Sequence, residues 1–172
     1  QDCLGANRIF VERPVYEAFC EKFVAATKAL SVGKGMDDPD IGPLMNETAV
    51  AKQKSHVDDA VQKGAKVLCG GAAHEKGPLF WQPTVLADVP DDALILREET
   101  FGPVVGIMPV AGDTEAIRLM NDSRYGLTAA VWTADSEAAS GLAELLETGT
   151  VFMNRCDYLD PELAWVGVKD SG

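Results

Sequence analysis

The chain has 172 residues, of which 47% are hydrophobic and 24% are charged; this length and composition predict one globular domain with a buried core and argue against a disordered segment. Its 15 Lys and Arg against 27 Asp and Glu give a net charge of −12, which repels nucleic acid and anionic lipid headgroups, so we expect no nucleic-acid partner and no membrane partner. The sequence has no run of about 18 apolar residues and no basic segment followed by an apolar one, so nothing in it indicates a membrane span or a secretory leader.

The four cysteines lie far apart in the sequence; they are Cys3, Cys20, Cys69 and Cys156. No two of them have the close spacing of a zinc site, so we expect no bound metal. A chain of this size folds without disulfides, and reduced thiols are typical of the cytoplasm. We therefore expect a cytoplasmic protein with free thiols.

The first predicted elements are a strand at residues 7–11 and a helix that begins at Pro14, a residue favoured in the first helical turn. The apolar residues of this helix recur every three or four positions and predict one stripe that faces the core. They are Val15, Phe19, Phe23, Ala26 and Leu30. Cys20 lies beside the stripe, so we expect it to pack in the core. Gly, Pro and Asp make residues 31–46 a long loop.

A second helix is predicted from about Asn46 to Lys63, with Gly64 as a left-handed residue at its end. Its valines at positions 50, 57 and 61 share one side and are expected to face the core. His56 has charged and polar neighbours in the sequence, so we expect it to face solvent rather than to act in catalysis.

The remaining chain alternates between strands and helices. Residues 65–71 are predicted as a strand, and Pro83 would keep the extended run 79–89 at a sheet edge or interrupt it. Further strands are predicted at 103–110, 127–133 and 149–154. Helices are predicted at 113–121, with Ile117 and Met120 pointing inward, and from a cap at Asp135 or Ser136.

This alternation predicts an α/β fold, with a mostly parallel sheet, helices on both of its faces and a single domain over residues 1–172. In such sheets, functional sites gather at the carboxyl ends of the strands. The loops that begin near Thr133 and Asn154 follow two of the predicted strands. We therefore expect these loops to help build a site.

Cys3 is either a buried, unreactive residue or a nucleophile, and the residues around it leave both interpretations open. Most lone cysteines are packed and inert. A reactive thiol needs help to lose its proton, and neither His56 nor His74 is near Cys3 in the sequence. The backbone amide of Cys3 could stabilise an oxyanion, and Arg8 adds positive charge nearby.

A second candidate stretch covers residues 97–105, with the sequence REETFGPVV. One interpretation is a charged turn before a buried strand, with Phe101 in the core, and the residues taken alone favour it. In the other interpretation, Glu99 accepts hydrogen bonds from paired hydroxyls, as on a ribose, while Phe101 lines a flat ring.

Four stretches, taken together in their order and at their separations, resemble the catalytic, C-terminal domain of the aldehyde dehydrogenase superfamily. They are QDCLGANRIFV (Gln1 to Val11), EETFGPVV (Glu98 to Val105), NDSRYGL (Asn121 to Leu127) and GTVFMN (Gly149 to Asn154). The resemblance covers essentially the whole chain and implies the α/β fold of that domain.

The resemblance implies an NAD(P)-dependent aldehyde dehydrogenase, which oxidises an aldehyde to a carboxylic acid. Cys3 matches the family nucleophile: it would attack the aldehyde, the thiohemiacetal would give a hydride to NAD or NADP, and water would release the acid from the thioester. The Cys3 amide would supply an oxyanion donor. Glu99 matches the carboxylate that holds the nicotinamide ribose, and Phe101 matches the ring beside the nicotinamide.

Five further positions match those that shape the substrate pocket in the superfamily. They are Asp2, Leu4, Asp157, Leu159 and Trp165. For Leu159 and Trp165, packing in the core is an equal alternative. Residues 164–172 depart from the usual Pro-Phe-Gly-Gly run, with Trp165 as the surviving aromatic residue, so the identity of the aldehyde stays open.

Members of the superfamily carry a cofactor-binding domain before the cysteine, together with a cofactor-binding lysine, a glutamate base and an asparagine of the oxyanion hole. This chain begins two residues before Cys3, so the resemblance implies a fragment of a longer parent chain. The partners that it implies are a small aldehyde and the cofactor-binding domain of the same parent chain. The full-length protein is expected to form a homo-oligomer. We expect the fragment to bind NAD or NADP weakly or not at all, and to be inactive alone as a dehydrogenase. Two alternatives stay open, a cysteine esterase that uses Cys3 and a non-catalytic interaction or oligomerising fragment.

Overall fold

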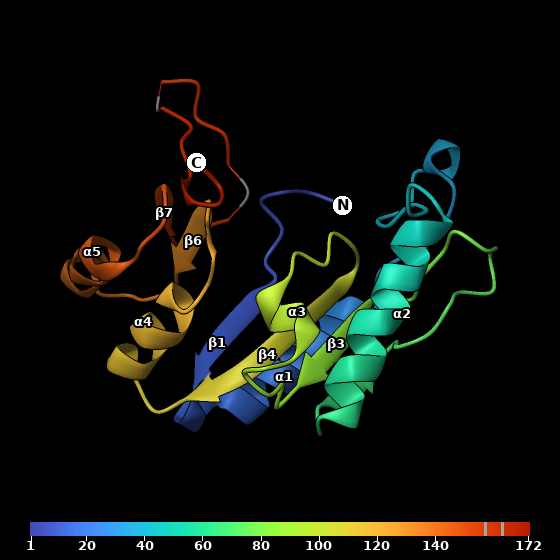
Figure 1. Ribbon diagram of the computed structural model, residues 1–172, viewed down its shortest axis with the longest axis horizontal. Helices are drawn as coiled ribbons and strands as arrows, with labels where there is room; N and C mark the ends of the chain where they lie inside the picture. Colours follow the sequence, from blue (N-terminus) through green and yellow to red (C-terminus); the bar gives the residue numbers. More distant parts are fainter. Residues whose placement is uncertain (157, 163) are drawn as a thin grey trace. The chain divides into compact units, whose positions relative to one another are not determined.

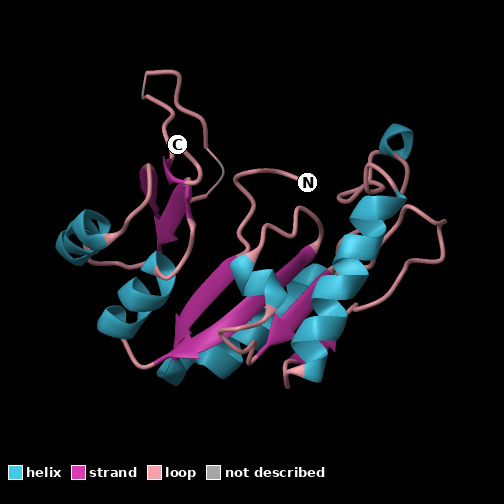
Figure 2. Cartoon of the chain, in the orientation of Figure 1, coloured by secondary structure: helices cyan, strands magenta, loops and turns pink. Residues whose placement is uncertain are grey.

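The computed structural model describes residues 1–156, 158–162 and 164–172. The chain forms two compact units, Gln1–Pro109 and Val110–Gly172 (Figure 1). Both units combine strands with helices (Figure 2), which confirms the predicted α/β class. The organisation of the whole chain as one domain stays a prediction. Among the described residues, no helix has both the length and the apolar character that crossing a membrane requires.

A four-stranded sheet forms the centre of the first unit, in the order β1-β4-β3-β2. The strands are β1 (Arg8–Glu12), β2 (Lys66–Cys69), β3 (Thr84–Ala87) and β4 (Val104–Val110). β3 pairs parallel with β4, from Thr84 opposite Val104 to Ala87 opposite Ile107, and antiparallel with β2. The arrows of β1 and β4 point the same way in Figure 1, so the sheet is mostly parallel, as predicted.

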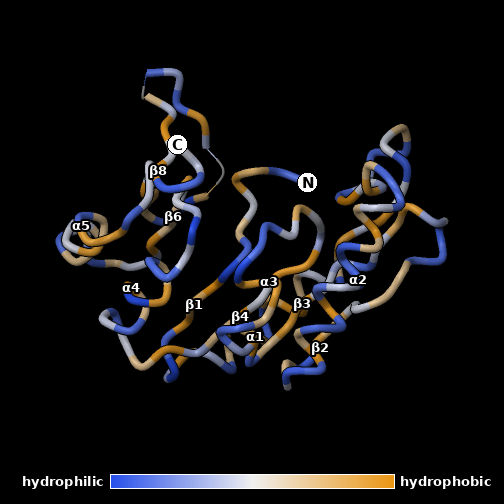
Figure 3. Tube along the Cα trace, in the orientation of Figure 1, coloured by the Kyte–Doolittle hydropathy of each residue, from blue (hydrophilic) through white to orange (hydrophobic). Residues whose placement is uncertain are grey.

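Helices cover both faces of this sheet, which confirms the predicted layers. Val85 and Leu86 are adjacent in β3, so their side chains point to opposite faces, and both are fully buried. Val85 packs in a cluster with residues of α1 (Arg13–Lys28), and Leu86 in a cluster with residues of α2 (Glu47–Gln62). Strands that are covered on both faces are mainly apolar, and the hydropathy colours of Figure 3 show this along the sheet.

The buried side of α1 differs from the prediction. Val15 is 54% exposed, and Leu30, beyond the end of the helix, is 40% exposed. The residues that pack on the sheet are instead Tyr16, Phe19, Cys20, Phe23 and Val24. This set and the predicted set both recur at helical spacing and share two phenylalanines, so periodicity alone did not fix the rotation of the helix. The packing of Cys20 in the core is confirmed.

The ends of α2 agree with the prediction, but its buried side does not. The Asn46 side chain accepts a hydrogen bond of 2.8 Å from a backbone N–H of the first turn, and Gly64 follows the helix with a φ of 109°. Val57 is buried as expected, whereas Val61 is 43% exposed. His56 is 2% exposed, so the expectation that it faces solvent was wrong. The reason is a contact with a loop that lies 44 residues further along the chain.

The segments that connect the elements of the first unit include a short helix, a bridge and the residues around Pro83. Residues 31–46 include a short helix, η1 (Gly35–Asp37), and a bridge between Val32 and Ile41. Pro83 interrupts the extended run 79–89, because β3 begins directly after it, in the interior of the sheet and not at an edge. The missing N–H of proline therefore lies outside the ladder. After β3, α3 (Leu94–Arg97) leads toward β4.

The described part of the second unit contains helices and short strands. They are α4 (Asp113–Asn121), β5 (Tyr125–Gly126), β6 (Thr128–Val131), α5 (Ser136–Leu145), β7 (Thr150–Met153) and β8 (Val168–Lys169). β6 pairs parallel with β7, and β5 pairs antiparallel with β8. Asp135 caps α5 as predicted, because its carboxylate accepts two backbone N–H groups of the first turn. In α4, Leu119 is buried, while Ile117 and Met120 are half-buried.

Candidate active site

Cys3 lies at a tight turn that exposes its side chain. The backbone oxygen of Asp2 accepts a hydrogen bond of 3.1 Å from the Gly5 N–H, and the Asp2 carboxylate accepts one of 3.0 Å from the Leu4 N–H. An aspartate that bonds to the backbone two residues on closes a turn locally. Cys3 is exposed and forms no disulfide, so the buried alternative is wrong. The pocket roles of Asp2 and Leu4 stay predictions.

The residue at the start of this turn is tied to the segment that precedes α2. Gln1 Nε2 donates to the backbone oxygen of Pro43 at 3.1 Å, and Gln1 Oε1 accepts from the Met45 N–H at 2.9 Å. A side-chain amide that bonds at both of its ends has a fixed orientation. Gln1 therefore anchors the chain two residues before the thiol.

The backbone amide of Cys3 is available to donate. The amides of Leu4 and Gly5 are used within the turn, but no hydrogen bond from the Cys3 N–H, or to its thiol, exists within the described residues. Arg8 lies over the Phe10 ring, 5.6 Å from its centroid, at a separation where cation–π attraction acts. The turn thus offers an oxyanion donor beside the sulfur, and no described residue is hydrogen-bonded to the thiol as a base.

Glu99 and Phe101 lie on the loop between α3 and β4. The Glu99 carboxylate is half-buried, and within the described ranges it has no hydrogen bond or ion pair. Phe101 is also half-buried and has a φ of 53°, a left-handed conformation that is unfavourable for a bulky residue. Phe101 is not part of the buried core, so the interpretation that places it there is wrong.

Two buried polar side chains of α2 hold this loop. Gln53 Nε2 donates to the Thr100 backbone oxygen at 2.9 Å, and His56 Nδ1 lies 3.1 Å from Thr100 Oγ1. At Gly102, an added Cβ would lie 2.4 Å from Gln53 Oε1, so the loop backbone packs directly on that amide. Sequence reasoning missed these residues because the contacts join positions 47 and 44 residues apart, and no local pattern marks such pairs.

The surroundings of His56 favour its neutral form. Burial lowers its pKa, and the charge of Lys52 lowers it further, against the opposing effect of Glu98. His56 Nε2 lies 3.5 Å from the Glu98 carboxylate, but burial dominates, so this contact joins a neutral imidazole to a carboxylate. Since a carboxylate only accepts, we assign the hydrogen of the neutral ring to Nε2, so that Nδ1 would accept the hydroxyl proton of Thr100.

The lowered pKa of His56 predicts how stability depends on pH. Its pKa in the folded chain lies below the value of 6.5 for an unperturbed histidine, so the unfolded chain binds the proton first as the pH falls. The free energy of unfolding should therefore decrease as the pH falls below about 6.5. Urea denaturation at a series of pH values measures this decrease.

The variant His56→Gln isolates this effect, because it removes the titrating ring and keeps a polar side chain. Its free energy of unfolding should change less with pH between about pH 6.5 and pH 5 than that of the wild type. Asp59 and Asp88 also have lowered pKa values, but their contributions are lost only below about pH 4. The same pH dependence in both proteins would contradict the assignment to His56.

The Cys3 turn and the Glu99 loop lead into neighbouring strands. Cys3 precedes β1, the loop precedes β4, and these strands are adjacent and run the same way (Figure 1). The amino ends of parallel neighbours meet at one edge of a sheet. The structure therefore brings both segments to the same edge of the sheet. This edge is formed by the amino ends of β1 and β4, whereas the strand pattern of the sequence predicts a site at carboxyl ends.

The loops expected at carboxyl ends, after Thr133 and Asn154, are joined by their own hydrogen bonds. Asn154 Nδ2 donates to the Thr133 backbone oxygen at 2.8 Å, and Asn154 Oδ1 accepts from the Thr133 N–H at 3.0 Å. Asn154 has a φ of 54°, which asparagine tolerates better than most residues. This pair connects the ends of β6 and β7, and a further role in a site stays a prediction.

The remaining predicted pocket residues are Asp157, Leu159 and Trp165. Asp157 lies outside the described residues. Leu159 is 61% exposed and Trp165 is 41% exposed, so the alternative that they pack in the core is wrong. Apolar side chains also line ligand pockets, and that role stays a prediction for these residues.

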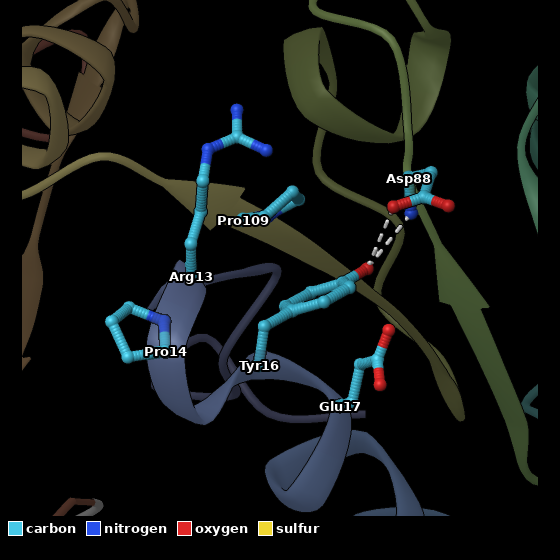
Figure 4. Close-up of a pocket in the computed structure, with 6 residues that line it drawn as sticks. All are labelled: Arg13, Pro14, Tyr16, Glu17, Asp88 and Pro109. Atoms are coloured by element: carbon cyan, nitrogen blue, oxygen red, sulfur yellow. Dashed lines mark hydrogen bonds between the residues drawn. The ribbon is translucent and has the colours of Figure 1, made fainter.

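A polar hollow near the start of α1 was not predicted (Figure 4). The Tyr16 hydroxyl lies 3.1 Å from the Asp88 carboxylate and accepts from the Asp88 N–H at 3.1 Å. Lys66 Nζ lies 2.8 Å from the same carboxylate group, and this hydrogen bond lowers the pKa of Asp88, while burial raises the pKa of Tyr16. Because Tyr16, Asp88 and Lys66 satisfy one another, they fasten α1 to the end of β3.

Comparison with known proteins identifies the family. The sequence pattern of the group described as "Aldehyde dehydrogenase family" matches residues 1–172, the whole chain. The chain belongs to the aldehyde dehydrogenase family. The resemblance inferred from the sequence motifs is thereby confirmed for the family, while the identity of the chain as the catalytic, C-terminal domain stays a prediction.

Relatives in the aldehyde dehydrogenase family include curated proteins and solved structures. The NADP(+) succinate-semialdehyde dehydrogenase GabD of Escherichia coli is 41% identical over 173 residues, which cover 100% of this chain and 36% of the relative. The structure of a succinate-semialdehyde dehydrogenase from Burkholderia pseudomallei matches with a TM-score of 0.97 and 41% identity, over 100% of this chain and 36% of that one. An aldehyde dehydrogenase from Mycobacterium tuberculosis, complexed with NAD+, matches with a TM-score of 0.94 and 35% identity, over 99% and 36% of the two chains. The chain therefore spans about 36% of the length of these relatives.

Proposed function

We propose that this chain carries the thiol chemistry of an NAD(P)-dependent aldehyde dehydrogenase, with Cys3 as the nucleophile. The observation that carries the proposal is the Cys3 turn, where an exposed thiol lies beside a backbone N–H that has no partner within the described residues. Membership of the family supports aldehyde oxidation as the reaction of the parent protein. In this proposal the chain is the catalytic domain of that protein.

Cys3 would act by covalent catalysis. The thiol loses its proton to water or to a base from outside this chain, and the sulfur attacks the aldehyde carbon while the carbonyl electron pair moves to oxygen. The Cys3 N–H donates to this oxyanion, and protonation of the oxygen gives a thiohemiacetal. NAD or NADP, when bound, would supply the hydride acceptor for the oxidation of the thiohemiacetal to a thioester, with the hydroxyl proton passing to water, and Glu99 and Phe101 would hold its nicotinamide end. Water then attacks the thioester, which releases the carboxylic acid and restores the thiol.

Glu99 and Phe101 fit the nicotinamide end of NAD or NADP. A half-buried carboxylate without a partner in the described ranges can accept both hydroxyls of a ribose, and an aromatic ring close by offers its face to the nicotinamide. We assign these two roles to Glu99 and Phe101. Because the chain covers 36% of a typical relative, the rest of the nucleotide would contact other parts of the parent protein. The chain alone is therefore expected to bind NAD or NADP weakly or not at all.

For the substrate we propose a short aldehyde that also carries a carboxylate. Two of the similar proteins are named as succinate-semialdehyde dehydrogenases. The residues that would shape the pocket are Asp2, Leu4, Asp157, Leu159 and Trp165. The proposed partner is the cofactor-binding domain of the same parent chain. The full-length parent protein is proposed to be a homo-oligomer.

Alkylation of the chain by iodoacetamide tests the role of Cys3 against a matched thiol. Cys3 and Cys156 are both exposed and free, whereas Cys20 is buried, and burial raises the pKa of Cys20. Peptide mapping by mass spectrometry follows the rate of alkylation at each thiol. Added succinate semialdehyde should slow the reaction at Cys3 and leave Cys156 unchanged, because the thiohemiacetal occupies only the nucleophilic sulfur.

The outcomes of this experiment separate the alternatives. No protection of Cys3 by the aldehyde, or equal protection of both thiols, would overturn the role of Cys3. Turnover of p-nitrophenyl acetate that is lost in Cys3→Ser and kept in Cys156→Ser would support a cysteine esterase. Self-association together with an unreactive Cys3 would support the non-catalytic alternative. Formation of NADH or NADPH from an aldehyde by the chain alone would contradict its expected inactivity.

A further inference from the structure

The contacts of His56 bear on the loop that carries Glu99 and Phe101. Three polar side chains beside this loop are almost fully buried: Gln53 is 0% exposed, His56 2% and Thr100 1%. Buried polar groups reduce stability unless they are hydrogen-bonded. These three side chains join α2 to the loop, so the position of Thr100 is set by α2.

We propose that His56 is a positioning residue for the nicotinamide nucleotide: together with Gln53 it holds Thr100, and thereby orients Glu99 and Phe101 on either side. This inference rests on the proposed function, which gives Glu99 and Phe101 their roles. His56 acts through Thr100 and touches neither the nucleotide nor the aldehyde.

Thr100 is held at both its backbone and its side chain. Gln53 Nε2 donates to its backbone oxygen at 2.9 Å, and His56 Nδ1 lies 3.1 Å from its hydroxyl oxygen. Gln53 and His56 are three residues apart in α2 and therefore lie on the same side of the helix. Fixing both groups restricts the peptide units that join Thr100 to its neighbours in the loop.

The backbone of Phe101 indicates that the loop is held in an unfavourable conformation. Its φ of 53° is rare for a bulky residue, and such conformations persist where the surroundings over-determine them. Thr100 is fixed on one side of Phe101, and Gly102 packs against the Gln53 amide on the other. Without the His56 contact, we expect Phe101 to move to a more common backbone conformation.

Protonation of His56 would act on the same contact. The charged groups that face His56 are Lys52 and Asp59 on α2 and Glu98 on the loop. With a neutral ring, Nδ1 accepts the Thr100 hydroxyl proton. With a charged ring, Nδ1 becomes a donor and the hydroxyl must turn to accept. The loop should therefore respond to the titration of His56.

NMR of the isotope-labelled chain tests this inference without an enzyme assay. In the wild type, the backbone chemical shifts of Phe101 should follow the pH titration of the His56 ring. In His56→Phe, these shifts should lose their pH dependence and move to values typical of negative φ. In His56→Gln, the side-chain amide can still accept the hydroxyl proton, so the shifts should stay near the wild-type values but no longer follow the pH.

Val57→Ala is the control, because it removes buried apolar atoms from the same helix and leaves the contact with Thr100 intact. It should lower stability without moving the Phe101 signals. If His56→Phe does not fold, the pH response of His56→Gln decides the question. Phe101 signals that titrate in His56→Gln as in the wild type would overturn the inference. The alkylation of Cys3 does not depend on this loop, so its failure would overturn the proposed function separately.

Discussion

Replacing Gly149 with alanine is expected to destabilise the second unit strongly. An added Cβ would lie 1.7 Å from the backbone oxygen of Val166 and 2.6 Å from its carbonyl carbon. Backbone atoms cannot rotate away as the end of a side chain can, so the segment that contains Val166 must move. Overpacking of this kind costs about 3 kcal/mol or more where the backbone is displaced. Urea denaturation measures the loss.

Gly141→Ala is the matched control for this substitution. Gly141 lies within α5, and an added Cβ there meets nothing within 4 Å. Alanine is favoured over glycine inside a helix, so this variant should gain about 0.5–1 kcal/mol. The two substitutions add the same methyl group to the same unit, and they should change stability in opposite directions. Equal stabilities would contradict the close approach of Val166 to Gly149.

The helices show how far sequence patterns determine this fold. The cap of α5 was predicted at Asp135 or Ser136, and the start of α2 at about Asn46, because helix starts depend on residues within one turn of the helix end. The buried side of α1 was predicted incorrectly, since Val15 and Tyr16 both begin an acceptable helical stripe. What decides between them is the sheet that the helix meets. That information lies in residues far away in the sequence.

His56 shows the same limit within the candidate site. Its neighbours in the sequence are polar and indicate a solvent-facing histidine, yet the ring is buried against Thr100. A buried polar pair gives no periodic signal, because each partner is satisfied by one residue elsewhere in the chain. The motifs that contain Cys3 and Glu99 could be found because each is continuous. The side chains that hold the Glu99 loop could not, because they come from another element.

The edge of the sheet at which the candidate residues gather also differs from the sequence argument. The rule that sites lie at carboxyl ends directed attention to Thr133 and Asn154, which are hydrogen-bonded to each other. Cys3 and Glu99 instead precede β1 and β4. The pattern of strands along the sequence does not say which strands are neighbours. The strand order makes β1 and β4 neighbours, and so brings together two segments that are distant in sequence.

Gly102→Ala is expected to disturb the loop that carries Glu99. An added Cβ would lie 2.4 Å from Cδ and Oε1 of Gln53 and 2.5 Å from its Nε2. Gln53 is completely buried and donates to the Thr100 backbone oxygen, so its amide cannot swing aside without breaking that bond. We expect a loss of about 1–3 kcal/mol in the free energy of unfolding. Gly42→Ala, where an added Cβ meets nothing within 4 Å, is the control and should be close to neutral.

A second substitution at Gln53 shows whether this contact is the cause. Gln53→Ala alone removes the donor to Thr100 and should cost about 1–3 kcal/mol. It also removes the atoms that an alanine at position 102 would meet. The double variant Gln53→Ala, Gly102→Ala should therefore be more stable than the sum of the single losses predicts, by at least about 1 kcal/mol. Additive losses would mean that the methyl group of the alanine at position 102 clashes with something other than Gln53. The Gln53 side-chain amide would then not set the path of the loop.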